Sequence, residues 1–327
     1  MIKFFRQSYA IQYVVIALMA IALWIPAFVS GGMTKGMEEP VTPIFNLVNR
    51  LLGFSTIAQY AFAFVLLLLE TLMFNAIMVN NQIVGKVSTI GAFVFVLLMS
   101  LTCTQTCFYP FALSVFFILL AISNLFDIYL MPSPELNLLK TGIFIALASM
   151  CYFPSILLVL WVVVALPIAK KGSLRLQLIP IFGFLFVYFF YFVGVFLLGG
   201  FQSMLSGYRD YFNSVKFSVD GFNLKIIGLL SVLVLSTVLL LFGGSKVNFE
   251  KTIAVRTKIS MTVIMAAFAL LLLFLGGNIL MNGLIFIVLA VLISYAFSYI
   301  SNTGWANLFL TVFLLLVFAN HYYFKLL

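Results

Sequence analysis

The chain has 327 residues, of which 65% are hydrophobic and only 8% are charged, with a formal net charge of +9. A water-soluble protein needs far more polar surface to face water, so this composition excludes an ordinary soluble domain and indicates that lipid surrounds most of the chain. The polar segments between the apolar runs are too short to form a separate soluble domain. Residues 1–327 are therefore expected to form a single transmembrane helical domain.

Apolar runs of the length needed to cross a bilayer follow one another along the chain. A crossing helix needs about 20 apolar residues, because the hydrocarbon core is about 30 Å thick and a helix rises about 1.5 Å per residue. The predicted spans are Ala10–Val29, Ile57–Val79, Ser88–Thr106, Phe108–Leu130, Leu176–Leu198, Leu224–Phe242, Ser260–Leu275, Ile279–Tyr299 and Ala306–Phe324. The first run is too long for a signal-peptide core and lacks a small-residue cleavage site, so we interpret it as an uncleaved span.

The basic residues predict the orientation, since Lys and Arg are retained in cytoplasmic loops. They occur at the N-terminus, in the turn 170–175 and in the loop 243–258, so these three regions are expected in the cytoplasm of a bacterium, with the protein in its inner membrane. The longer polar loops 30–56 and 201–223 are then expected outside, whereas the side of the C-terminus stays open. The net charge reflects this bias and an attraction to anionic lipids. A nucleic-acid partner is not expected, because no basic stripe is interleaved with polar surface.

A break near Pro154 is predicted from the same orientation. Between Lys86 and Lys170, both expected in the cytoplasm, the chain must cross an even number of times, yet only three apolar stretches separate them. The stretch Thr141–Ile168 is therefore expected to be a broken pair of helices, since proline lacks a backbone donor and disfavours helix in the residue before it. The alternative is one long kinked helix. When Thr141–Ile168 is counted as two helices, the chain is expected to form an all-α polytopic membrane protein of about 10–11 transmembrane helices.

Two segments of the outer loops have the pattern of interfacial amphipathic helices. In Ile44–Phe54 the apolar residues leave the polar side chains, including Arg50, on the opposite face. In Phe201–Val215 apolar residues recur every three or four positions, and Arg209 lies among the polar ones. Helices of this kind lie in the membrane interface with one face toward the acyl chains. They are expected either to cap the bundle or to frame a laterally open mouth for a lipid.

Two carboxyl groups are predicted inside spans. Glu70 stands among Leu and Thr in the second span, and Asp127 lies near the inner end of the fourth. Ionisable residues at such positions are expensive and commonly functional. We expect them at similar depths, in one of two roles: proton coupling or substrate binding, or interhelical hydrogen bonding.

The sequence offers no metal or cofactor site. Cys103, Cys107 and Cys151 have no histidine or carboxylate at metal-ligand spacing, so buried free thiols are expected. His321 is interpreted as a polar anchor in the last span, with a proton relay as the alternative. Nucleotide-binding, zinc-protease and esterase motifs are absent from the chain.

Nearly the whole chain resembles a family of multispanning inner-membrane proteins of Bacteroidota that has no accepted activity. The resemblance is carried by apolar motifs, which are Phe108-Tyr-Pro-Phe-Ala-Leu-Ser through Asn124-Leu-Phe-Asp127, Thr141-Gly142 through Tyr152-Phe153-Pro154, and Ala165-Leu-Pro-Ile168. It implies a fold of many membrane spans and no particular reaction.

The order of the elements resembles that of membrane glycosyltransferases that use polyprenyl-phosphate sugar donors. The shared features are a first span, an acidic outer loop with an amphipathic helix, and many spans with a broken segment. The resemblance implies that an acidic residue of the first outer loop acts as catalytic base, here Glu38 or Glu39. This loop contains no aspartate, and the chain has no D-x-D motif.

Two hypotheses follow. One is an enzyme or transporter for a lipid-linked envelope substrate, such as a polyprenyl-phosphate-linked sugar, with Glu38 or Glu39 near the headgroup and Arg50 or Arg209 binding phosphate. The other is a non-catalytic membrane subunit whose polar groups serve helix packing with partner membrane proteins. A polar pocket that reaches Glu38, Glu39 or Glu70 would favour the first hypothesis, and a solid bundle with an exposed apolar flank the second.

Overall fold

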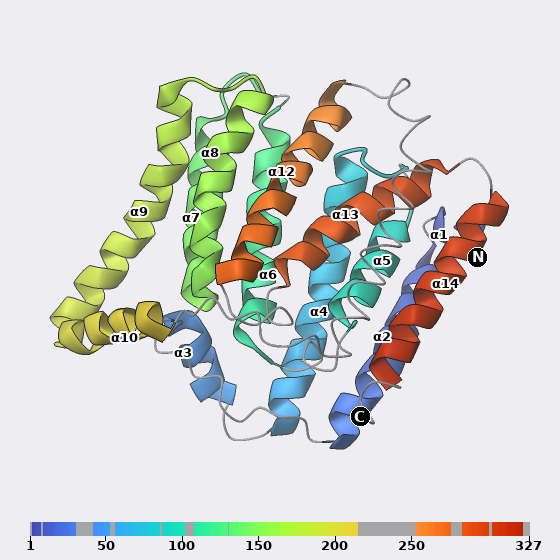
Figure 1. Ribbon diagram of the computed structural model, residues 1–327, viewed down its shortest axis with the longest axis horizontal. Helices are drawn as coiled ribbons and strands as arrows, with labels where there is room; N and C mark the ends of the chain where they lie inside the picture. The colour runs from blue at the N-terminus through green and yellow to red at the C-terminus, as the bar shows by residue number, and fades with distance from the viewer. Residues whose placement is uncertain are drawn as a thin grey trace.

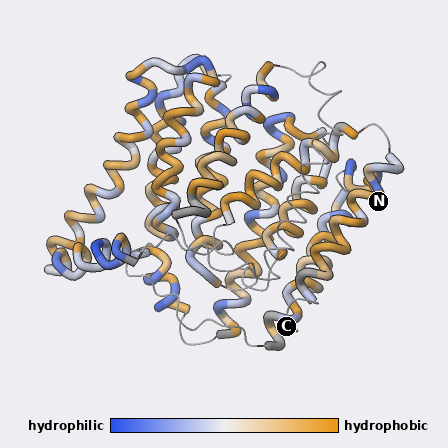
Figure 2. The backbone as a smooth tube through the Cα atoms, viewed as in Figure 1, coloured by the Kyte–Doolittle hydropathy of each residue, from blue (hydrophilic) through white to orange (hydrophobic). Residues whose placement is uncertain are grey.

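The computed structural model in Figure 1 describes residues 2–7, 9–30, 42–52, 56–85, 87–101, 108–129, 131–214, 253–275, 283–300 and 303–322. Within these ranges the regular elements are helices, and their apolar residues dominate almost every one (Figure 2). Glu38, Glu39, Cys103, Cys107 and the predicted span Leu224–Phe242 lie outside the described residues, as does the side chain of His321.

The helices have the lengths of an all-α polytopic membrane protein, as predicted. Those long and apolar enough to cross a membrane are α4 (Thr56–Asn80), α6 (Pro110–Asp127), α9 (Leu174–Leu197) and α12 (Ile253–Leu275). Other apolar helices beside them are α2 (Ala10–Ser30), α5 (Ile90–Met99), α8 (Leu158–Ile168), α13 (Leu284–Tyr299) and α14 (Thr303–Tyr322). The remaining helices are α1 (Ile2–Phe5), α3 (Pro43–Leu52), α7 (Glu135–Cys151) and α10 (Phe201–Ser214).

The α3 and α10 helices lie at the same end of the bundle, which we call the α10 end (Figure 1). The α6–α7 and α8–α9 loops lie at the opposite end, where Lys171 Nζ donates a hydrogen bond to the Met131 carbonyl at 3.1 Å. The first helix, α1, belongs to this opposite end too, because the Phe5 carbonyl accepts a hydrogen bond from Thr89 N, just before α5 begins. The N-terminus and the basic turn 170–175 therefore share one end of the molecule, and the two amphipathic helices share the other.

The predicted broken pair near Pro154 is confirmed. The α7 helix ends at Cys151, Tyr152 is extended, and a 3-10 turn η1 (Phe153–Leu157) leads into α8, which runs back toward the opposite end. Because α7 begins at Glu135, six residues before the expected Thr141, it is long enough to carry the break to the α10 end. The chain thus runs along the bundle twice where the alternative placed one long kinked helix.

The α5 helix forms the centre of the core. All ten of its residues are buried, and it packs against α4 and α13. It is shorter than the predicted span Ser88–Thr106, since it ends at Met99. Its first turn is held by Asn75 of α4, which accepts a hydrogen bond from Ala92 N at 3.2 Å and donates one to the Ser88 carbonyl at 3.2 Å. Asn75 therefore satisfies a backbone donor that a helix N-terminus leaves unpaired.

Arg6 has a packing role in addition to its positive charge. Its guanidinium group donates hydrogen bonds to the Phe297 carbonyl at 2.9 Å and the Ile300 carbonyl at 2.8 Å, at the C-terminal end of α13. A cation at this end of a helix pairs with carbonyls that have no intrahelical partner and with the negative end of the helix dipole. The interaction therefore fixes the N-terminal segment against the bundle.

Candidate functional site

Glu70 lies near the middle of α4, 14 residues after Thr56 and 10 residues before Asn80. At about 1.5 Å per residue, Glu70 is about 15 Å from the C-terminal end of the helix, or about half the thickness of a hydrocarbon core. Its side chain is only 3% exposed. A carboxyl group is therefore held at mid-depth within a span that is otherwise almost entirely apolar.

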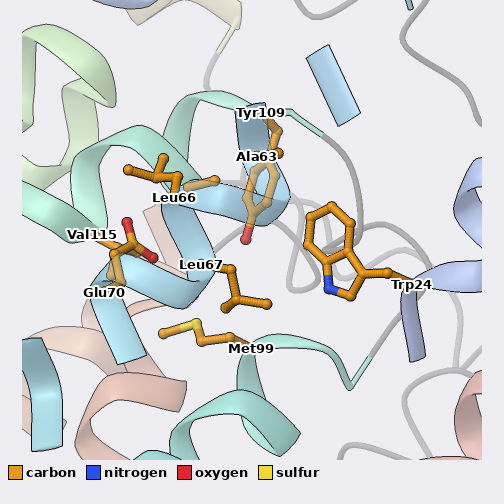
Figure 3. A pocket seen from close by; sticks show the side chains of 9 residues that line it. Trp24, Ala63, Leu66, Leu67, Glu70, Met99, Tyr109 and Val115 are labelled. Carbon is orange, nitrogen blue, oxygen red and sulfur yellow. The ribbon is translucent and has the colours of Figure 1, made fainter. Parts of the chain in front are cut away.

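A small cavity lies against this carboxyl group (Figure 3). The space available to the centre of a water molecule is about 20 Å³, which is enough for one water, since about 10–15 Å³ is required. The helices α2, α4, α5 and α6 contribute its walls, which are formed by Trp24, Ala63, Leu66, Leu67, Glu70, Met99, Tyr109, Ala112 and Val115. The cavity is thus the size of a water site and too small for a lipid headgroup.

The two oxygens of the Glu70 carboxyl group do not both have hydrogen-bond partners among the described residues. Among the described residues, Oε1 is buried without a hydrogen-bond partner, while the carboxyl group interacts with the backbone of Phe116 on α6. Buried polar atoms nearly always have a partner, because burying one without a hydrogen bond is unfavourable. An ionised carboxylate would be more unfavourable still, so the neutral, protonated form is the one suited to this position.

The ends of two helices contribute residues to the wall of the cavity. Met99 is the last residue of α5, and Tyr109 immediately precedes α6. The indole Nε1 of Trp24 donates a hydrogen bond to Ser100 Oγ at 3.2 Å, which fixes the end of α5 against α2. Helices that end inside a membrane bundle commonly contribute to ion and substrate sites in transporters. The cavity beside Glu70 therefore lies between the end of α5 and the start of α6.

Asp127 does not join this site, and the expectation that it lies at the depth of Glu70 is wrong. It is the last residue of α6, and its side chain is exposed. Val115, the cavity residue on the same helix, lies 12 residues earlier, a separation of about 18 Å along the axis. The helix ends at Asp127, short of the predicted Leu130, so this carboxyl group reaches the opposite end of the bundle.

Asp127 instead faces a lysine that sequence reasoning placed in a loop. Lys258 lies on α12, is only 5% exposed, and donates a hydrogen bond from Nζ to Asn81 Oδ1 at 2.7 Å. Its charge also interacts with that of Asp127. The apolar residues Ile253 and Val255 were the available signal that this span begins before Ser260. Lys258 is therefore part of the helix packing at the opposite end.

The amphipathic helices carry the two predicted arginines. Arg50 on α3 and Arg209 on α10 are both exposed. The α3 helix is attached to the bundle through Phe45, which stacks on Phe108 with a centroid distance of 5.0 Å. The structure places both arginines at the α10 end and neither among the side chains that line the Glu70 cavity.

An aromatic cluster attaches α10 to the break between α7 and α8. The ring of Phe153 contacts those of Tyr208, Tyr211 and Phe212 at centroid distances of 5.4, 5.2 and 5.7 Å. The Tyr208 hydroxyl also hydrogen-bonds with Tyr188, whose hydroxyl pairs with Ser149 Oγ at 2.9 Å. Burial raises the pKa of Tyr208, and the neighbouring Tyr188 and Tyr191 raise it further, so this hydroxyl stays neutral.

The described residues contain no group of three His, Cys, Asp or Glu side chains that could hold a metal ion. Cys151 is a buried free thiol at the end of α7. Comparison of the chain with models of protein families, with curated proteins and with solved structures gave no match in any of the three.

Proposed function

We propose that this integral membrane protein is a proton-coupled carrier of a lipid-linked envelope substrate in the bacterial inner membrane, with its α10 end at the outer leaflet. The observation that carries the proposal is the Glu70 carboxyl group, which is buried at mid-depth beside a water-sized cavity, with Oε1 unpaired among the residues that the structure describes. Ionisable residues inside membrane spans are expensive and mark proton relays and substrate pathways. A carboxyl group kept only for helix packing would be expected to have both oxygens paired.

The α10 end supports the choice of a lipid-linked substrate. On α10, Leu205 and Phe212 are 58% and 63% exposed and suit contact with acyl chains, while Arg209 is exposed on the same helix. The guanidinium groups of Arg50 and Arg209 suit a phosphate, which they can bind through two parallel hydrogen bonds. A polyprenyl-phosphate-linked sugar has this combination of a long apolar chain and an anionic headgroup. Glycosyl transfer with Glu38 or Glu39 as base is the enzymatic form of the same proposal.

Proton flux in reconstituted vesicles tests the carrier. The wild-type protein and Glu70→Gln are reconstituted with total lipid extract from the native membrane, a pH gradient is imposed, and an entrapped pH dye reports proton movement. We expect flux with the wild type that requires the extract and is abolished in Glu70→Gln, since the amide cannot release a proton. Glu135→Gln, at the start of α7, is the matched control and should retain the flux.

Equal flux through wild type and Glu70→Gln would remove the basis of the proposal. Native mass spectrometry of the protein extracted with its own lipids identifies the substrate class in the same preparation. We expect a retained polyprenyl-phosphate-linked species that is reduced in the Arg50→Gln/Arg209→Gln double variant.

A membrane subunit without transport activity is the second candidate, and one observation favours it. The outward face of α9 is lined with exposed phenylalanines, among them Phe182, Phe189 and Phe196 at 63%, 62% and 68% exposure. Lipid covers such a face in a monomer, but a partner membrane helix suits it equally well. Co-purification of a stoichiometric partner that is lost on replacing these phenylalanines, together with normal activity of Glu70→Gln in cells, would favour this candidate.

A further inference from the structure

The cavity beside Glu70 extends from this residue in one direction only. On α4 the other lining residues precede Glu70, and on α6 they belong to the first turns, so both sets lie toward the α10 end. Trp24 lies in the last turns of α2, and Met99 is the last residue of α5; both helix ends also point toward the α10 end. The other residues that line the cavity in Figure 3 therefore lie on the α10 side of Glu70.

An aromatic stack closes the other direction. Phe74 lies four residues after Glu70 on α4, hence on the same face of the helix. Its ring stacks on that of Phe95 of α5, with a centroid distance of 4.7 Å and an interplanar angle of 24°. Phe74 is 1% exposed and Phe95 is fully buried. One turn further along α4, Ile77 and Met78 are 5% and 0% exposed. The amide of Asn75, which is 4% exposed, is hydrogen-bonded to the start of α5, so packed side chains close the route to the opposite end.

We infer that Glu70 exchanges its proton only with the membrane face at the α10 end, through the water-sized cavity, and that the Phe74–Phe95 stack is the gate that separates Glu70 from the opposite face. The inference rests on the proposed proton-coupled function and specifies its sidedness. A carrier must expose its proton site to one face at a time, since simultaneous access from both would let protons leak across the membrane. In the described arrangement of α4, α5 and α6, the cavity side of Glu70 faces the α10 end.

The transfer itself is a simple exchange. The O–H bond of the Glu70 carboxyl group breaks, and the proton passes to a water molecule in the cavity to form hydronium, which leaves Glu70 as a carboxylate. Loading is the reverse step. The volume of about 20 Å³ admits one water of this kind and excludes hydrated cations, which carry several waters.

Infrared spectroscopy of oriented vesicles tests the inference. The protein is reconstituted with its α10 end outward, and the orientation is verified by labelling Ser203→Cys with a membrane-impermeant maleimide in a background without other cysteines. The C=O stretch of protonated Glu70 is assigned as the band absent from Glu70→Gln. We expect this band to disappear when the pH is raised outside, and to persist when the same rise is made inside the vesicles.

Opening the gate should abolish this sidedness. In Phe74→Ala the band is expected to respond to pH on either side, whereas Phe189→Ala, which removes a phenylalanine from the exposed face of α9, should behave as wild type. If Phe74→Ala does not fold, Phe95→Leu keeps most of the volume and removes the stack. A wild-type band that responds equally to both faces, only to the opposite face, or to neither overturns the inference.

The two proposals fail in different ways. A band that titrates from the α10 end alone, together with unchanged proton flux in Glu70→Gln, leaves the access path intact and removes the carrier function. Abolished flux in Glu70→Gln with a band that titrates from both faces leaves the function intact and removes the gate.

Discussion

Lys258 of α12 and Asn81, the residue that follows α4, are joined by a 2.7 Å hydrogen bond between Nζ and Oδ1. Both side chains are buried, at 5% and 4% exposure. The pair therefore connects two helices that are far apart in the sequence, and it holds an ammonium group at the end of the bundle opposite α10.

Removing Asn81 should destabilise the protein more than removing Lys258. Asn81→Leu leaves a buried ammonium group without its hydrogen-bond acceptor, which costs more than the about 1–3 kcal/mol of a neutral unpaired group. Lys258→Met removes the charge and leaves an amide oxygen unpaired, at about 1–3 kcal/mol. The exposed Asp127 loses a charge interaction that is weak at the surface. Thermal unfolding in detergent measures both. The double variant should be more stable than Asn81→Leu alone, and additive losses would contradict the interaction.

Replacing Glu70 with an apolar residue should make the folded protein more stable. Because Oε1 is buried and has no hydrogen-bond partner in the described part of the chain, Glu70→Met should raise the unfolding temperature, corresponding to about 1–3 kcal/mol. Trp24→Phe is the comparison within the same cavity, and it should lower stability because Ser100 loses its donor. A lower unfolding temperature in Glu70→Met would instead support the role of an interhelical hydrogen bond for this carboxyl group.

The contact between α7 and α9 should tolerate no side chain at Gly142. A Cβ on Gly142 would overlap the Pro180 carbonyl, and one on Gly183 would lie 2.5 Å from the Leu139 carbonyl. Small residues permit such close approach of membrane helices. We expect Gly142→Ala to cost about 1–3 kcal/mol. Gly194→Ala is the matched control on α9, where a Cβ meets nothing within 4 Å, and it should be neutral or stabilising.

The attachment of α10 should depend on Phe153. Phe153→Ala removes the ring that contacts three aromatic residues of α10, so tryptic cleavage at the exposed Arg209 should accelerate several-fold while the core unfolds at nearly the same temperature. Tyr208→Phe removes only one hydrogen bond, worth about 1 kcal/mol, and should have a smaller effect. Unchanged cleavage in Phe153→Ala would show that other contacts hold α10.

The sequence predicted those features that depend on composition and local pattern. The spans, such as the one around Glu70, are predicted because a run of apolar residues long enough to cross a bilayer is visible in the sequence. The break near Pro154 is predicted because the number of crossings between two basic loops must be even and because proline interrupts a helix. Other features depend on which helices become neighbours. Three such features arise from packing between distant segments. They are the hydrogen bond of Lys258 to Asn81, the stacking of Phe74 on Phe95, and the early end of α5 at Met99. Asp127 was misplaced in depth because the end of α6 depends on its surroundings as well as on hydropathy.

The short α5 helix has a consequence for how the protein enters the membrane. Ten residues span about 15 Å, roughly half of the hydrocarbon core, so this segment cannot insert as an independent transmembrane helix. Its unsatisfied terminal groups need partners such as Asn75 of α4 from the moment they leave water. We therefore expect α5 to enter the bilayer together with α4, already packed against it.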